Sequence, residues 1–153
     1  MLHGENASRA GPGIGQSPAP SAFLGLVSAR RLLSALVDED LRTAIFALGP
    51  HIRYVAFGSG QSVDMSSRDG LAGESDESSD FFEELLVNPT LLTLARQRGE
   101  LDCGGLRYLV VGYGNFSQVV VESPDGHVSV CVERDADPVR VAEQVARLLA
   151  DGA

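Results

Sequence analysis

Lysine and tryptophan are both absent from this chain of 153 residues, so every basic side chain other than histidine is an arginine. The formal net charge is −9, from 21 acidic and 12 basic residues. Nucleic-acid backbones and anionic membrane surfaces are bound by basic patches, and a composition this acidic argues against both. We expect neither nucleic acid nor membrane as a partner.

Cysteine is also scarce, since Cys103 and Cys131 are too few to form the disulfide framework of a small secreted protein. Cys131 stands within an apolar run, where a small buried thiol is the expected role. No apolar stretch approaches the ~20 residues that a membrane helix needs, and the N-terminal segment has no signal-peptide run. The sequence therefore predicts a cytoplasmic protein.

Residues 1–22 are mostly Gly, Pro, Ser and Ala and contain few apolar anchors. Such a segment buries too little apolar surface to offset the entropy of ordering it. We predict a disordered tail over residues 1–22 and one folded domain over residues 23–153, which is long enough to bury a core.

Apolar periodicity and turn residues predict the order helix, two strands, helix, three strands, helix. The predicted ranges are 29–48, 52–57, 61–66, 80–98, 106–111, 116–122, 127–133 and 138–149. The last three strands are separated by residues 112–115 and 123–126, which are rich in the Gly, Asn, Asp and Pro of tight hairpins. We therefore expect an antiparallel meander in the second half of the chain.

The middle helix has its own start, break and stop signals. Asp80 precedes Glu83 by three residues, which is the spacing of a capping box. Asn88 followed by Pro89 predicts a second cap inside the same segment, which is then either one kinked helix or two short ones. Gly99 is expected to end this helix.

No cluster of residues predicts catalysis, a metal site or a cofactor. The three histidines are His3, His51 and His127. None of them has an acid or a cysteine at the spacing of metal ligands. Asp135 and Asp137 could share a metal, but Asp137 directly precedes Pro138 and is better explained as the cap of the last helix. The acidic loop over residues 69–80 lacks the alternating ligands of a calcium loop.

The order of elements over residues 29–149 resembles that of the Roadblock (dynein light chain) family. The resemblance is carried by the strand that runs into a hairpin at residue 57, the leucine-rich middle helix, and the turns Ser123-Pro-Asp-Gly126 and Asp135-Ala-Asp-Pro138. Family members often have Ser-Arg-Asp-Gly between the first two strands. Here Ser67-Arg-Asp-Gly70 follows the second predicted strand, so either the strand boundaries are shifted or the loop is atypical.

The resemblance implies an α/β fold of the α+β type, in which a five-stranded antiparallel sheet has the middle helix on one face and the first and last helices on the other. It also implies a non-catalytic, dimeric adaptor that binds a Ras-like small GTPase or a related protein, often as its regulator in bacterial signalling. In the family dimer, the strand after the middle helix pairs with its copy while the middle helices pack together. The implied homodimer interface consists of Leu91, Leu94, Ala95, Leu106, Tyr108 and Val110.

Residues that such a dimer leaves exposed on the middle helix would face the protein partner. We expect these partner-binding residues to be Glu83, Glu84, Arg96 and Gln97. An alternative function is a small-molecule sensor domain of the PAS or GAF type, which needs a cavity between sheet and helix. The Val and Leu residues of the predicted strands favour a filled core over such a cavity.

Overall fold

The computed structural model describes residue 32 and residues 35–70 and 77–152. The chain divides into two units, Met1–Ser34 and Ala35–Ala153, and all five strands lie in the second. The predicted tail over residues 1–22 and residues 71–76 of the acidic loop lie outside the described residues.

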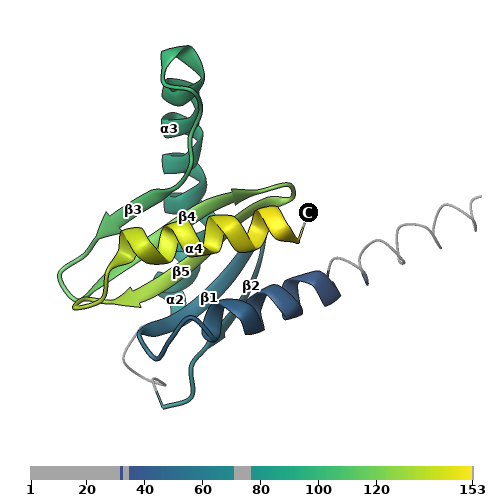
Figure 1. The fold of residues 1–153 in the computed structure, drawn as a ribbon, viewed down its shortest axis with the longest axis vertical. Helices are drawn as coiled ribbons and strands as arrows, with labels where there is room; N and C mark the ends of the chain where they lie inside the picture. Colours follow the sequence, from purple (N-terminus) through teal and green to yellow (C-terminus); the bar gives the residue numbers. More distant parts are fainter. Residues whose placement is uncertain (1–31, 33–34, 71–76, 153) are drawn as a thin grey trace, which may run out of the picture. The chain divides into compact units, whose positions relative to one another are not determined.

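The strands form one antiparallel sheet in the order β2-β1-β5-β4-β3 (Figure 1). Their bounds are β1 Ile52–Ser59, β2 Ser62–Ser67, β3 Leu109–Gly112, β4 Phe116–Ser123 and β5 Gly126–Glu133. The predicted meander is therefore β3-β4-β5, and the first hairpin is β1-β2. The two edges of the sheet are β2 and β3.

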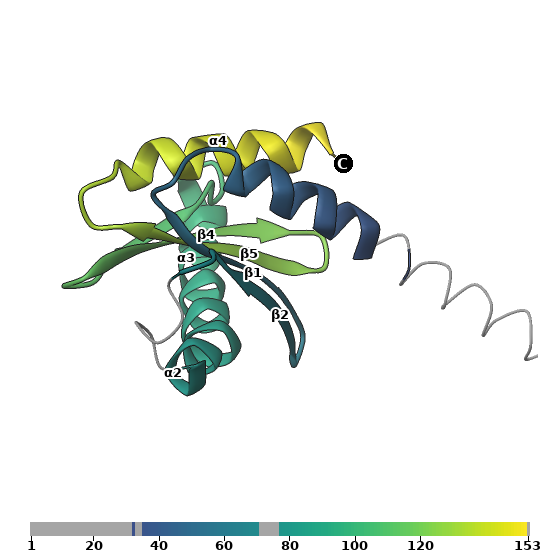
Figure 2. The same ribbon diagram turned by 90° about the horizontal axis from the view of Figure 1, so that it is seen from below.

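Helices cover both faces of this sheet, as the resemblance implied. The first helix, over residues 35–46, and α4, Pro138–Asp151, lie on one face (Figure 2). The other face carries α2, Glu77–Phe82, a π-helical turn η1, Glu83–Val87, and α3, Asn88–Asp102. These three segments follow one another without a gap, and together they are the middle helix, residues 77–102.

Alternation along the strands divides the core into two layers. The layer beneath the first helix and α4 is almost entirely aliphatic. Its fully buried residues are Ile45, Ile52, Val55, Val119, Val128, Val130, Val132, Val141, Ala142 and Val145. The layer beneath the middle helix has a smaller apolar cluster of Tyr54, Ala56 and Cys131, and Leu92 and Val120 are also buried outside the aliphatic layer. Polar side chains fill much of the rest of this interface.

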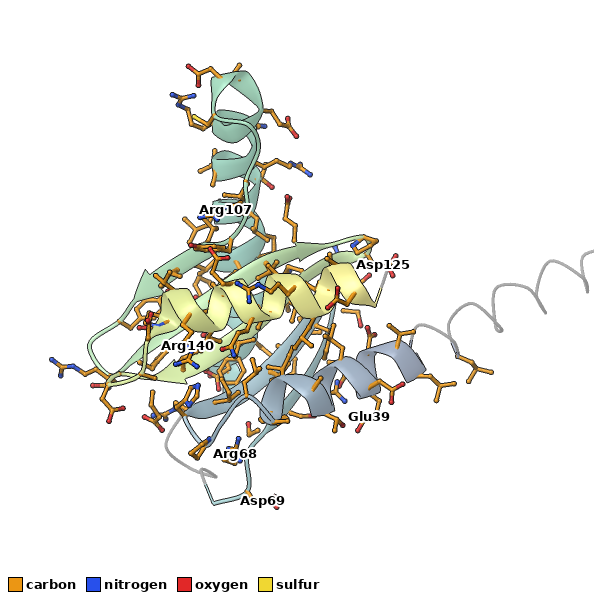
Figure 3. The ribbon with its side chains drawn as sticks, in the orientation of Figure 1. Glu39, Arg68, Asp69, Arg107, Asp125 and Arg140 are labelled. Carbon is orange, nitrogen blue, oxygen red and sulfur yellow. The ribbon has the colours of Figure 1, made fainter. Side chains whose placement is uncertain are left out.

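The first hairpin turns at Gly60 and Gln61, because Ser59 pairs with Ser62. Gly60 has a φ of 61°, a left-handed conformation that glycine adopts without strain. The Ser67-Arg-Asp-Gly70 run therefore begins at the last residue of β2 and lies outside the turn between the first two strands. Within this run, Arg68 (Figure 3) connects the end of β2 to the start of β1. Its guanidinium donates to the carbonyl oxygens of Ile52 at 2.9 Å and Gly49 at 2.8 Å.

The predicted strand over residues 106–111 begins three residues too early. Leu106 and Tyr108 belong to the connection before β3. Gly99 also does not end the middle helix, which continues to Asp102. The carbonyl oxygen of Gly99 accepts from the backbone N–H of Gly105 at 3.1 Å, so the chain leaving the helix is held against it before it reaches the sheet.

Both predicted caps within the middle helix are wrong, whereas the cap of the last helix is confirmed. Asp80 lies inside α2, and the Asn88 side chain turns inward to Glu84. The carboxylate of Asp137 accepts from the N–H groups of Val139 and Arg140, both at 3.1 Å, ahead of α4. The difference is one of exposure, because Asp137 stands at the surface while Asn88 is buried.

Candidate functional site

The outer surface of the middle helix exposes several large apolar side chains among polar ones. Among its exposed large side chains are Phe82, Leu86, Leu94 and Leu101, of which Leu94 is 60% and Leu101 79% exposed. Leu91 and Ala95, two further residues of the expected dimer interface, are partly buried. The C-terminal half of α3 extends beyond the edge of the sheet (Figure 1), so this apolar surface has little of its own chain beneath it.

Strand β3 gives the same region an open sheet edge. It pairs with β4 on one side, and among the described residues no strand pairs with its other side. Tyr108 and Val110, predicted to lie in the dimer interface, pack instead against the aliphatic core under α4. The Tyr108 hydroxyl lies 3.3 Å from Glu143 Oε1 on that helix. Backbone pairing at the β3 edge remains open to a partner, although these two side chains are already engaged.

The four residues expected to bind a partner do not share one environment. Arg96 and Gln97 are exposed on α3, and Arg96 lies 3.6 Å from Glu122 in an exposed ion pair. Glu83 is half-buried and accepts from the Tyr113 hydroxyl at 2.9 Å. Burial raises the pKa of the Glu83 carboxyl, while the Tyr113 hydrogen bond acts in the opposite direction.

Glu84 is the clear exception, because only 1% of it is exposed and it cannot face a partner. Its carboxylate is the acceptor at the centre of a buried polar cluster, which we call the Glu84 cluster. The donors within 3.1 Å are Tyr54 Oη at 3.1 Å, Asn88 Nδ2 at 3.0 Å, Gln118 Nε2 at 3.1 Å and His127 Nε2 at 2.9 Å, together with Ser129 Oγ. The prediction that Glu84 contacts a partner is therefore wrong.

The cluster joins the middle helix to the centre of the sheet. Its donors come from β1, β4 and β5, and from Asn88 one helical turn along. A carboxylate buried without such donors would cost several kcal/mol, on the order of 3 or more, which is why so many converge on it. Burial and the nearby Glu84 raise the pKa of Tyr54, so this hydroxyl stays protonated and donates.

Satisfying the carboxylate leaves other atoms of the cluster without partners. Asn88 Oδ1 and Gln118 Oε1 are buried and accept no hydrogen bond from the described protein atoms. Both amides use their NH2 groups on Glu84, and Gln118 Nε2 also donates to Ser129 Oγ at 3.0 Å. The arrangement thus supplies donors to the carboxyl oxygens of Glu84 and leaves the two amide oxygens without them.

A shallow groove of about 360 Å³ opens beside the cluster. Tyr54 and Cys131 line it from the sheet, Glu83 from the middle helix, and Tyr113 and Phe116 from the β3–β4 hairpin. The two aromatic rings lie 5.0 Å apart between centroids. This volume falls at the lower end of ligand pockets, which run from ~300 to ~1,000 Å³, so it is the place to test the sensor alternative.

The two cysteines differ as expected. Cys131 is buried, and its desolvation raises the pKa of the thiol to about 12. Cys103 is exposed, and its hydrogen bond to Asp102 Oδ1, 3.3 Å long, raises the pKa of its thiol. In the described part of the chain no three His, Cys, Asp or Glu side chains are grouped as metal ligands, and none of the helices there could cross a membrane.

No protein-family model matches the sequence, and no curated protein matches it significantly. Solved structures do match. The Roadblock/LC7 domain from Streptomyces avermitilis is 20% identical, with a TM-score of 0.56 over 72% of this chain and 90% of that domain. MglC from Myxococcus xanthus is 16% identical, with a TM-score of 0.47 over 75% of this chain and 98% of its own. MglB in a tetrameric arrangement is 14% identical, with a TM-score of 0.49 over 74% of this chain and 88% of its own. The first of these likenesses shows that the chain has the fold of a Roadblock/LC7 domain, as the order of its elements predicted.

Proposed function

We propose that this protein is a non-catalytic homodimeric adaptor that binds and regulates a Ras-like small GTPase or a related protein partner. The observation that carries the proposal is that an unpaired strand edge and an exposed apolar helix surface lie in the same region. The open edge of β3 lies in the same region as α3, which extends beyond the sheet and exposes Leu94 and Leu101.

A second copy of the chain fits both surfaces. An open strand edge is a template for pairing, and a two-fold axis allows β3 to pair with its own copy. The helices α3 of the two copies would then lie on the same face of the joined sheet, where each can cover the exposed Leu94 and Leu101 of the other. Burying such side chains supplies the free energy for association, at roughly 25 cal/mol for each Å² of apolar surface.

The partner is proposed from the fold resemblance together with the charge of the surface. In such a dimer Arg96 and Gln97 would be displayed twice, and arginine suits bidentate contact with carboxylates on a protein. The net charge of −9 would steer a partner that presents a basic patch. These features suit a protein ligand better than an anionic one.

The oligomeric state tests the proposal most directly. Leu94→Glu and Leu101→Glu place a charge on the proposed interface at positions that are exposed within one chain, so neither should disturb the monomer fold. Leu36→Glu is the matched control, because Leu36 is 65% exposed on the first helix. Analytical ultracentrifugation should show a dimer for the wild type and the control, and monomers for the two α3 variants.

A wild-type protein that sediments as a monomer at micromolar concentration would overturn the dimer. Equal dimerisation of all four proteins would instead place the interface away from α3. The sensor alternative has a separate readout, since a small molecule bound in the groove should protect the exposed Tyr113 from chemical modification.

A further inference from the structure

The middle helix has a built-in weak point at the π-helical turn. The backbone N–H of Asn88 donates to the carbonyl oxygen of Glu83, five residues back instead of four. The next residue, Pro89, has no N–H, so the carbonyl of Leu85 loses the donor that a regular helix would provide. Two or more regular ladder bonds are thus missing or displaced at one place, which makes residues 83–89 the natural hinge of this helix.

Beyond the hinge, α3 is a long arm with few anchors. Its 15 residues span about 22 Å at 1.5 Å per residue. Only Asn88, Leu92 and Gly99 are buried, and the first two lie in the first turns beside the hinge. Its side-chain link to the sheet farther along is the exposed Arg96–Glu122 pair, a kind of contact that contributes little.

The Glu84 cluster is placed at this hinge. Glu84 lies within η1, and Asn88 is the first residue of α3, so the two ends of the weak point meet in one buried carboxylate–amide contact of 3.0 Å. The other four donors are on strands β1, β4 and β5, whose pairing fixes them relative to one another. A small change in the geometry of the cluster would therefore produce a larger displacement at the far end of α3.

We propose that the Glu84 cluster is a latch on this hinge: it fixes the orientation of α3 relative to the sheet, and its release lets α3 swing. The latch holds the exposed surface of α3, with Leu94, Arg96 and Leu101, in one position. The converse also holds, because any ligand that prefers a different orientation of α3 must act against the cluster. The inference concerns one chain, and it stands whether or not the partner is a GTPase.

The test compares a latch variant with a control that destabilises the opposite face of the sheet. Glu84→Gln keeps the size of the side chain but replaces one acceptor oxygen by a donor, which opposes the donors facing it. Val145→Ala removes buried methyl groups on α4, on the opposite face of the sheet, and leaves the cluster untouched. Spin labels at Gln97→Cys on α3 and Arg147→Cys on α4, in a Cys103→Ser background, report the orientation of the arm. All three positions are exposed, and the remaining Cys131 is buried.

In the wild type and Val145→Ala, with labelled protein diluted into an excess of unlabelled protein so that only distances within one chain are measured, we expect one narrow distance distribution and slow hydrogen exchange over residues 90–100. In Glu84→Gln, the distribution should broaden or shift, and exchange over the same residues should become at least about tenfold faster than in the control. If Glu84→Gln does not fold, Ser129→Ala removes a single donor and is read in the same way. An unchanged distance in the latch variant, or the same loosening of α3 in Val145→Ala, would overturn the proposal.

Discussion

His127 Nε2 lies 2.9 Å from Glu84 Oε2, although 43 residues separate the two in the chain. Both side chains are almost completely buried, and the contact joins the middle helix to β5. The ring of His127 also packs on the backbone of Gly58, where an added Cβ would lie 2.1 Å from its Cε1 atom. The position of the histidine is therefore fixed from the helix on one side and from β1 on the other.

Gly58→Ala should accordingly destabilise the protein through His127. The methyl group has no room unless the ring moves away from Glu84, and such overpacking costs about 1–3 kcal/mol. Gly114→Ala is the control, because nothing lies within 4 Å of a Cβ added there. Urea unfolding should separate the two variants, and equal midpoints would contradict the packing described for His127.

Glu84→Leu should be the most destabilising substitution in the middle helix. It keeps the volume but leaves buried donors without an acceptor, and each donor left unsatisfied costs about 1–3 kcal/mol. Glu100→Leu makes the same change on the exposed surface of α3 and should alter the free energy of unfolding by less than about 0.5 kcal/mol. Chemical denaturation of both variants measures the difference directly.

Arg68→Gln should also lower stability. The guanidinium donates to the carbonyls of Phe46, Gly49 and Ile52, at distances from 2.8 to 3.2 Å, where the first helix ends and β1 begins. Leaving part-buried carbonyls unpaired costs about 1–3 kcal/mol in total. Arg98→Gln removes an exposed pair with Asp102 and should be nearly neutral. A loss of stability no larger than that of Arg98→Gln would show that water replaces Arg68.

Arg96→Glu should weaken binding of the proposed GTPase by about tenfold, which corresponds to ~1.4 kcal/mol, and leave the melting temperature unchanged. The reason is that Arg96 is 49% exposed, so its charge is available to a partner, while its pairs with Glu100 and Glu122 are exposed and weak. Arg147→Glu on α4 is the control for net charge. Calorimetric titration gives the affinities, and an unchanged Arg96→Glu affinity would move the binding surface elsewhere.

The thiols provide a prediction that depends on pH. A raised pKa means less thiolate at a given pH, so Cys103 should react with iodoacetamide more slowly than an unperturbed thiol at neutral pH and faster as pH rises. Asp102→Asn removes the carboxylate that raises this pKa, so the reaction should become faster. Cys131 should react only after unfolding, which mass spectrometry of the alkylated peptides can show.

Elements governed by neighbours in sequence were predictable here. Asp137 caps α4 because its own chain supplies the N–H groups two and three residues later. The hairpin turns were predictable because glycine and proline set the backbone locally. The start of β3 was predicted three residues too early. It depends on the contact between Gly99 and Gly105, which the local pattern of apolar residues does not reveal.

The Glu84 cluster shows where prediction from sequence ended. Its members lie on the middle helix and on the strands β1, β4 and β5, so no spacing along the chain could bring them together. The local signals were modest: Glu84 and Asn88 are four residues apart in a helix that is otherwise leucine-rich, and β5 alternates His127 and Ser129 with valines. Polar residues in such patterns normally face water. Here the polar residues of the middle helix face those of β5, so both groups are buried between the helix and the sheet.

The strict alternation of β5 has a consequence for how the chain finds its fold. Sliding this strand by one residue would turn His127 and Ser129 into the aliphatic layer beneath α4 and press Val128 and Val130 against the Glu84 carboxylate. A purely aliphatic strand would suffer far less from such a slip, because either face could meet either layer. The central strand β5 is paired with β1 and β4 on its two sides. Its two faces differ in chemistry, so each face fits only one of the two layers. Misaligned sheets are penalised on both faces at once.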